Sequence, residues 1–310
     1  MNRFVALFGL ACLVPTVSGC GSDVKVNPTA TGSTLGSSAP KSATNKKFVI
    51  DTNESKVTFV MEAPSEKIRG RAAGATSGDL FIDPSDLTQT TGTIAVDLDK
   101  LELFQRVKSD DDKDFQSEQK SPKQNEHARD WLELTANEKR PEDVRRKNAR
   151  AEYKITSITS ASQKDVSKMT GAVRTVQIKA EGTLLLHQHT KEKVAVDLEV
   201  AFKMDGDKIV SATIKTKAPI PINLAEYEVK PRDAFGSFLT KTLDALSSKV
   251  AKEAPIELEI VMKPEGMPLS TTPPPPDPTP LAVVGSSSAS AAPSASAAPS
   301  AATSASPYGK

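Results

Sequence analysis

Apolar and polar residues alternate strictly along much of the middle of the chain. A period of two places every second side chain on the same face of an extended strand, so one face is buried and the other solvated. The runs with this pattern are Val57–Met61, Ile94–Leu98, Tyr153–Ile155, Val176–Ile178, Leu184–Leu186, Val194–Met204 and Ile256–Met262. Half-polar strands are typical of antiparallel sheets, because parallel strands are usually apolar on both faces.

Residues that favour turns separate these runs. Examples are Asp83-Pro84-Ser85, Thr91-Gly92 and Asp205-Gly206-Asp207. We count about eight strands, and a single antiparallel sheet of that size hides its apolar face by closing into a barrel or folding into a sandwich. The pattern therefore predicts a mainly β domain over residues 47–263.

Two segments of this domain do not alternate. Residues 105–150 are highly charged with mixed signs, which indicates a solvated excursion that is partly disordered around residues 110–123. Within it, Asn125–Leu134 is predicted to form a short helix with its apolar side chains turned inward. Residues Phe235–Ala251 repeat apolar side chains at steps of three and four, which predicts an amphipathic helix that caps an opening of the barrel.

The N-terminus resembles a bacterial lipoprotein signal peptide. Arg3 is followed by the apolar run Phe4–Val14, which is too short to span a bilayer comfortably, and then by the lipobox-like Val17-Ser18-Gly19-Cys20. The resemblance implies cleavage of residues 1–19 and acylation of Cys20, which anchors the chain to a membrane. The alternative is an ordinary secretory signal that happens to contain a cysteine.

The segments that flank the domain have a composition typical of disordered chain. Residues 20–46 are rich in Gly, Ser, Thr, Asn and Pro and are predicted to be a flexible tether. Residues 264–310 form a Pro/Ser/Ala-rich tail, in which Pro273–Pro276 favours polyproline II. Because Cys12 leaves with the signal peptide and Cys20 carries lipid, the mature chain is expected to form no disulfide.

Charge and motifs favour a protein that is neither an enzyme nor a nucleic-acid binder. The formal net charge is +1, from 40 basic and 39 acidic residues, and no basic stripe with interleaved aromatic residues occurs. No nucleophile elbow, P-loop or zinc-peptidase motif is found, so we expect no catalytic residues and no cofactor apart from a bound lipid.

Two groups of residues were weighed as metal sites. His187 and His189 would share one face of a strand, a spacing that zinc and copper sites use, but a turn with two solvated histidines is favoured. The acidic run Asp110–Asp114 lacks the glycine and the distant glutamate of an EF-hand, so a solvated loop is favoured there. We therefore expect no metal site.

Four segments, taken in order, resemble the YceI-like family of periplasmic lipid-binding proteins. They are Phe48–Phe59, His127–Leu132, Gly182–Val194 and Arg232–Gly236. The resemblance implies an extended lipocalin-like antiparallel barrel of about eight strands, with one or two short helices near its mouth and an interior tunnel that holds a long isoprenoid chain. The charged insertion before His127, the length of the helix Phe235–Ala251 and the Gln188-His189 pair depart from the family pattern.

The sequence thus predicts an envelope protein that carries an apolar ligand, anchored through Cys20 and facing the periplasm. Gly21 leaves both membranes open, and the outer membrane is favoured; the oligomeric state is open. The expected ligand-binding residues are Val196, Leu198, Val200, Phe202, Arg129 and Trp131. Arg129 and Trp131 would form a rim, where Arg129 meets the ligand's head group and Trp131 packs on its chain. In the alternative, Arg129 and Asp130 close a loop and Trp131 plugs the core. Alternatives for the whole protein are a structural lipoprotein with a filled barrel and a metal-binding protein that uses His187 and His189.

Overall fold

The computed structural model describes residues 29–30, 34–109, 111–137, 140–230 and 252–275. The strands are β1 (Thr29–Ala30), β2 (Lys46–Ile50), β3 (Lys56–Ala63), β4 (Glu66–Ala73), β5 (Thr76–Ile82), β6 (Thr91–Asp97), β7 (Glu102–Val107), β8 (Gln119–Lys120), β9 (Arg150–Ala161), β10 (Val173–Leu186), β11 (His189–Asp205), β12 (Lys208–Thr216), β13 (Ile220–Asn223) and β14 (Glu253–Pro264). The helices are α1 (Pro122–Trp131), α2 (Glu142–Asn148) and the 3-10 turns η1 (Leu87–Gln89), η2 (Leu98–Lys100), η3 (Val166–Lys168) and η4 (Leu224–Tyr227).

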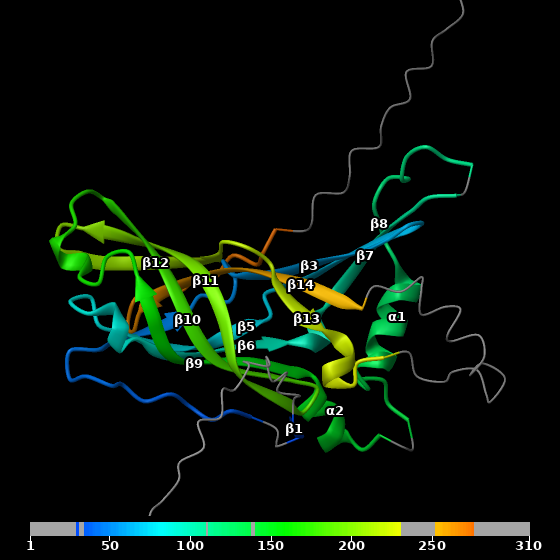
Figure 1. The fold of residues 1–310 in the computed structure, drawn as a ribbon, viewed down its shortest axis with the longest axis horizontal. Coiled ribbons are helices and arrows are strands. Elements are labelled where there is room, and N and C mark those ends of the chain that lie inside the picture. The colour runs from blue at the N-terminus through cyan, green and yellow to red at the C-terminus, as the bar shows by residue number, and fades with distance from the viewer. Residues whose placement is uncertain (1–28, 31–33, 110, 138–139, 231–251, 276–310) are drawn as a thin grey trace, which may run out of the picture.

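Eight of the strands close into an antiparallel barrel, here called the ring (Figure 1). Around the ring the order is β2, β5, β6, β9, β10, β11, β12 and β14, and β14 pairs back onto β2. This confirms the predicted mainly β, lipocalin-like barrel of about eight strands. Closure leaves no free edge in the ring itself, which is how all-β domains hide their unpaired backbone groups.

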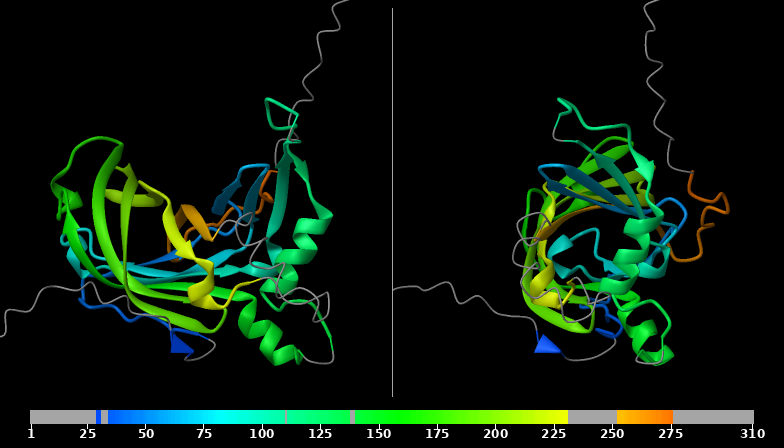
Figure 2. Two further views of the ribbon diagram at one scale, coloured as in Figure 1. Left: turned by 45° about the vertical axis from the view of Figure 1, so that its right-hand side comes forward. Right: turned by 90° about the vertical axis from the view of Figure 1, so that its right-hand side faces the viewer.

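Strand β14 is shared between the ring and a second region, here called the extension. Its C-terminal part lies between β2 and β12, where Met262 pairs with Ile50 and Ala212. Its N-terminal part lies between β3 and β13, where Ile256 pairs with Phe59 and Ile220. Beyond β3 the sheet continues through β4, β7 and β8, and α1 lies beside this part (Figure 2).

Hydroxyl side chains complete the hydrogen bonding of β14 where its neighbours change. Between β2 and β3, Ser55 Oγ accepts the N–H of Val261 at 2.9 Å, and the Val261 carbonyl accepts the N–H of Asp51 at 2.8 Å. Between β12 and β13, Thr216 Oγ1 accepts the N–H of Leu258 at 3.2 Å. Because an unpaired buried N–H is costly, these two hydroxyls allow one long strand to serve both regions.

The interior of the ring is filled by its own side chains. Phe48, Phe202, Ile260 and Met262 are each at most 1% exposed and belong to one continuous apolar cluster. An eight-stranded barrel has an interior just wide enough for side chains to fill it. Burial of each large apolar side chain stabilises the fold by about 1.5–3 kcal/mol, so this cluster is the main source of stability.

The extension has a smaller apolar cluster beneath α1 and η4. Its buried members include Leu132, Leu134, Leu186, Ile222 and Tyr227. The predicted helix Asn125–Leu134 is found as α1, with the bounds moved towards the N-terminus. The reason is local: Ser121 accepts the N–H of Gln124 as the N-cap, and Pro122 occupies the first turn, where a missing N–H costs nothing.

The charged segment 105–150 is more regular than the sequence predicted. It contains the end of β7, then β8, α1 and α2. The Arg69 guanidinium binds both carboxylate oxygens of Glu118 and stacks over the Phe104 ring at 4.4 Å, which holds the β7–β8 hairpin against β4. Mixed charge here therefore marks ion pairing between strands as well as solvation.

Residues 34–45, within the predicted tether, lie against the outside of the ring. The carboxylate of Glu152 accepts the N–H of Leu35 at 2.5 Å, and Asn45 Nδ2 donates to the carbonyls of Phe81 and Gln89 at 2.9 and 3.2 Å. Thr91 Oγ1 donates to the Ala39 carbonyl at 2.8 Å. This stretch of the predicted tether is therefore attached to the domain along its length.

Several predictions lie outside the described residues. These are the signal peptide, Cys20, the helix Phe235–Ala251, Arg232–Gly236 and the tail beyond residue 275. Among the helices that are described, none is long and apolar enough to cross a membrane.

A candidate apolar ligand cavity

The extension encloses an apolar cavity that has two lobes. The first, here called the α1 lobe, has a volume of about 120 Å³ and lies between α1 and strands β3, β4 and β7. Its lining includes Phe59, Met61, Ile68, Leu103, Trp131 and Val229. The second, here called the ring lobe, has a volume of about 110 Å³ and lies where the extension meets the ring. Its lining includes Val57, Ile94, Tyr153, Val194, Val196 and Leu258.

The two lobes adjoin at a narrow waist. Leu98, Leu186, Ile222 and Ile256 line both of them. These four side chains come from η2, β10, β13 and β14, so the waist is built from four different parts of the chain. The lobes therefore adjoin, and we refer to the two together as the passage from α1 towards the ring.

The few polar groups in this lining bind to other parts of the protein. The Tyr153 hydroxyl donates to the Val194 carbonyl at 2.8 Å, and burial raises the pKa of this phenol. Glu152 is 2% exposed, and its carboxylate accepts hydrogen bonds from Arg150 and from the N–H of Leu35. The ring lobe thus presents hydrocarbon surface and suits an apolar chain better than a charged molecule.

Gln124 and His127 are the polar side chains of the α1 lobe. Both come from α1, so the polar end of the passage is at the helix and the apolar end is at the ring. Gln124 Nε2 donates to Glu66 at 2.7 Å, and the His127 ring stacks on Trp131 with a centroid separation of 6.4 Å. A ligand with one polar end would place that end here.

A larger hollow of about 820 Å³ lies on the outside of the sheet and is much more polar. Among its charged side chains, Glu259 pairs with Lys56 and Lys215, both at 2.9 Å. Pairing lowers the pKa of Glu259 against the opposing effect of burial. Residues 270–275 of the chain form one wall, so this groove is a seat for the C-terminal segment and offers little to an apolar ligand.

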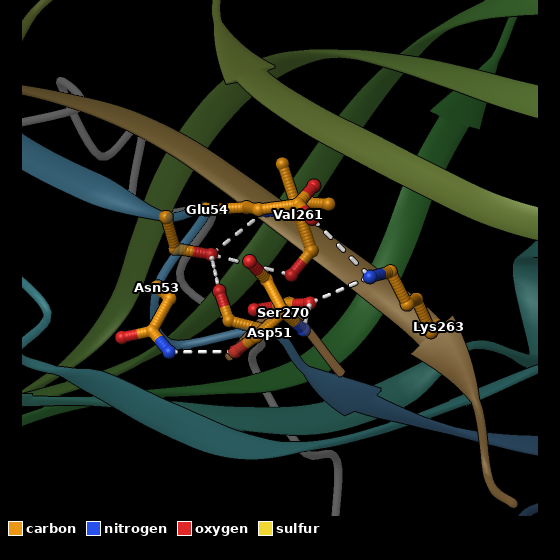
Figure 3. Close-up of polar contacts among 7 residues, drawn as sticks. Asp51, Asn53, Glu54, Val261, Lys263 and Ser270 are labelled. Carbon is orange, nitrogen blue, oxygen red and sulfur yellow. Dashed lines mark hydrogen bonds and ion pairs between the residues drawn. The ribbon is translucent and has the colours of Figure 1, made fainter. Parts of the chain in front are cut away.

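Asp51 fastens that C-terminal segment to the sheet (Figure 3). Its carboxylate is fully buried and accepts hydrogen bonds from Lys263 Nζ and from the N–H of Ser270, both at 2.7 Å. Burial alone would raise the pKa of Asp51, but these two bonds outweigh it and hold the pKa below its usual range. Asn53 adds a bond to the Ser270 carbonyl at 2.6 Å.

An Asp, a Lys and a Ser close together raise the question of catalysis. Ser55 Oγ donates to the Asp51 carbonyl at 2.7 Å and accepts the N–H of Val261, so its hydroxyl is engaged with backbone on both sides. Lys263 is held by Asp51 and by Glu54 at 3.2 Å. Among the described residues no basic side chain touches the hydroxyl, which is the contact that an activated serine requires, and the cluster is best described as a latch.

The residues predicted to bind the ligand fall into four places. Val196 lines the ring lobe, whereas Leu198, Val200 and Phe202 lie beyond it in the filled core, with exposures of 4%, 2% and 1%. Trp131 lines the α1 lobe. Arg129 lies outside the cavity, where it binds Asp99 at 3.0 Å, and Asp130 binds Arg140 at 3.3 Å.

Sequence reasoning missed much of the lining on β3, β4 and β13. Phe59 and Met61 were recognised as strand residues but were not assigned to the cavity, and Ile68 and Ile222 were not identified. The alternation at Phe59 and Met61 was the available signal, because it showed a buried face. Ile68 stands alone among charged neighbours and gives no such signal.

His187 and Gln188 form the two-residue turn between β10 and β11. Their φ angles are 49° and 62°, the left-handed conformation of a tight hairpin turn that Asn-Gly usually supplies. The expected solvated turn is wrong for His187, which is 4% exposed and lies 2.9 Å from the Tyr227 carbonyl through Nδ1. His189 bonds to the His187 carbonyl at 2.7 Å. Within the described residues no group of three metal-binding side chains gathers, here or at the acidic run.

Comparison with known proteins places this architecture in a family. No curated protein matches the chain. A solved polyisoprenoid-binding domain from Saccharophagus degradans, implicated in plant cell wall breakdown, is similar at 14% identity, over 70% of this chain and 98% of that one, with a TM-score of 0.42. The model of the YceI-like domain matches residues 48–262, which span the ring and the extension. The chain therefore belongs to the YceI-like domain family.

Proposed function

We propose that this protein binds the apolar chain of a lipid, such as a polyisoprenoid, in the two-lobed cavity of the extension. The observation that carries the proposal is the continuous hydrocarbon lining from α1 to the ring lobe. Transfer of apolar surface from water to such a lining is worth about 25 cal/mol per Å². Binding is by burial alone, without a covalent step, and the occupied hydroxyl of Ser55 fits a role without catalysis.

The polar end of the ligand is expected at α1, beside Gln124 and His127. Trp131 packs along the chain in the α1 lobe. Arg129 is near the same end of the molecule, and its pairing with Asp99 can be exchanged for a pairing with an anionic head group, since both partners are partly exposed.

The test is native mass spectrometry of the full chain purified from a bacterial host, followed by organic extraction. We expect a discrete added mass that extracts as a prenyl or acyl lipid. Ile222→Trp, which fills the waist, should remove the added mass, while the exposed control Val60→Trp should retain it. A clean apo mass that persists when isoprenoid lipids are offered would sink the proposal.

A structural role is the second candidate, and the filled core of the ring favours it. In that case the ring serves as a rigid support, and the C-terminal segment held by Asp51 makes the contacts. This candidate predicts that no lipid co-purifies with the protein. It also predicts that deletion of the residues beyond 270 abolishes the contacts that the C-terminal segment makes.

We further propose that acylation of Cys20 holds the protein on a membrane facing the periplasm, with the outer membrane favoured. The lipobox-like sequence before Cys20 supports this. Cys20→Ser should move the protein from the membrane fraction to the soluble periplasmic fraction. Retention of the variant in the membrane would contradict the proposal.

A further inference from the structure

Three strands of the ring point in the same direction, from the cavity into the ring. Strands β9 and β11 are both antiparallel to β10, and β11 and β14 are both antiparallel to β12, so β9, β11 and β14 point the same way. On each of them the lining of the ring lobe ends at a single residue. These residues are Tyr153, Val196 and Leu258.

The next side chain on the same face of each strand, two residues on, closes the passage. These side chains are Ile155, Leu198 and Ile260, with exposures of 3%, 4% and 0%, and none of them lines either lobe. All three belong to the continuous core of the ring, which goes on to Val200 and Phe202. We refer to these three residues as the floor.

The volume on the open side of the floor limits what can enter. An apolar cavity of about 150 Å³ holds one benzene-sized molecule. The two lobes, of about 120 and 110 Å³, are each slightly smaller than that. On that scale the two lobes together hold about nine carbons, so the part of a ligand that is buried above the floor is about as long as one geranyl chain.

We infer that the floor formed by Ile155, Leu198 and Ile260 sets the ligand's chain length, and that this protein selects short prenyl or acyl chains over long polyisoprenoids. The inference rests on the proposed function and adds the chemical class of the ligand. Because interior packing is dense, a longer chain would have to displace buried side chains that have nowhere to move. The polar end remains at Gln124 and His127, the polar side chains of the α1 lobe.

The experiment offers the full chain an equimolar mixture of geraniol, farnesol, geranylgeraniol and solanesol and measures retained ligands by native mass spectrometry. We expect geraniol and farnesol to be retained about tenfold better than the two longer alcohols, a difference of about 1.4 kcal/mol. Leu198→Ala opens the floor towards the ring and should shift the preference to geranylgeraniol. Ile260→Val makes a smaller opening and serves if Leu198→Ala does not fold.

The matched control is Val176→Ala, which removes volume from the ring core opposite Val200, beyond the floor, and leaves the three floor side chains in place. It should lower stability and leave the preference for short chains unchanged. Equal retention of solanesol and farnesol by the unmodified protein would overturn the inference while leaving lipid binding intact. Retention of none of the four alcohols would count against the proposed function itself. If the Leu198→Ala variant kept the original preference for short chains, the floor would not be what sets the chain length.

Discussion

The ring and the extension share one long strand and one alternating pattern, yet the ring is full beyond Ile155, Leu198 and Ile260, whereas the extension and the adjoining end of the ring contain a cavity. In the ring, strands close on every side at hydrogen-bonding distance, so side chains from opposite walls meet at the centre. In the extension, α1 and η4 complete the wall where a strand would otherwise lie. The side chains beneath them do not fill the whole interval, which leaves the α1 lobe. The comparison shows that space for a ligand arises where the sheet stops closing on itself.

The largest expected effect is a truncation in the ring. Phe202→Ala should lower the free energy of unfolding by about 3–5 kcal/mol, because the side chain is fully packed. Leu186→Ala, at the waist, should cost about 2 kcal/mol, since part of its surface already faces empty volume. Urea unfolding measures the free energy of unfolding of both variants. Equal decreases in this free energy would mean that the waist is as tightly packed as the ring.

Larger side chains on β11 also test whether the core of the ring is full and the ring lobe is empty. Val200→Phe should destabilise the fold by about 1–3 kcal/mol through overpacking. Val196→Phe lies four residues away on the same face but borders the ring lobe, so it should cost less than about 1 kcal/mol and lower lipid occupancy instead. A larger loss of stability in Val196→Phe would contradict the position of the cavity.

Acid should weaken the ring at the attachment of the N-terminal segment. Burial opposes ionisation of Asp83, but hydrogen bonds from Ser85 and Thr44 lower the pKa of its carboxyl to about 2. Because the folded pKa lies below the unfolded one, this stabilisation is present above about pH 4 and is lost as pH falls towards 2; it amounts to about 2 kcal/mol. Thermal unfolding across this range should show the loss, and Asp83→Asn should flatten the pH dependence.

A small and local effect is expected at the cap of α1. Ser121→Ala removes the hydrogen bond to the N–H of Gln124 and should cost about 1 kcal/mol. Because the helix forms one wall of the α1 lobe, hydrogen exchange should increase in α1 while the ring keeps its protection. Uniform loss of protection would show that the two regions unfold as one unit.

Much of the ring was predictable because its strands alternate. The run from Val194 to Met204 gave β11 and its buried face directly, and the turn at Gly206 gave the hairpin that follows. Strand β4 was missed, because Glu66–Ala73 carries charges on both faces and only one large apolar residue, Ile68. Periodicity cannot detect a strand whose stability comes from its neighbours.

The cavity was less predictable than the fold. Alternation identifies which face of β11 is buried, but Val196 and Phe202 have the same pattern, and only the opposing walls decide which one faces empty space. Trp131 was identified because a lone tryptophan in a charged segment is conspicuous. The waist depends on residues brought together from four parts of the chain, which no local pattern records.

The attachment of residues 34–45 to the ring has a mechanical consequence. The short strand β1 pairs with β11 at Thr190 and His189, so the chain leaves the domain close to the β10–β11 turn. Residues 20–28 link this point to Cys20, and a fully extended chain of that length spans about 30 Å. With an acyl chain on Cys20, the domain would rotate about this short linker with its β10–β11 end nearest the bilayer. The protein would then sample a thin layer of periplasm in a restricted range of orientations, and could not range across the whole width of the compartment.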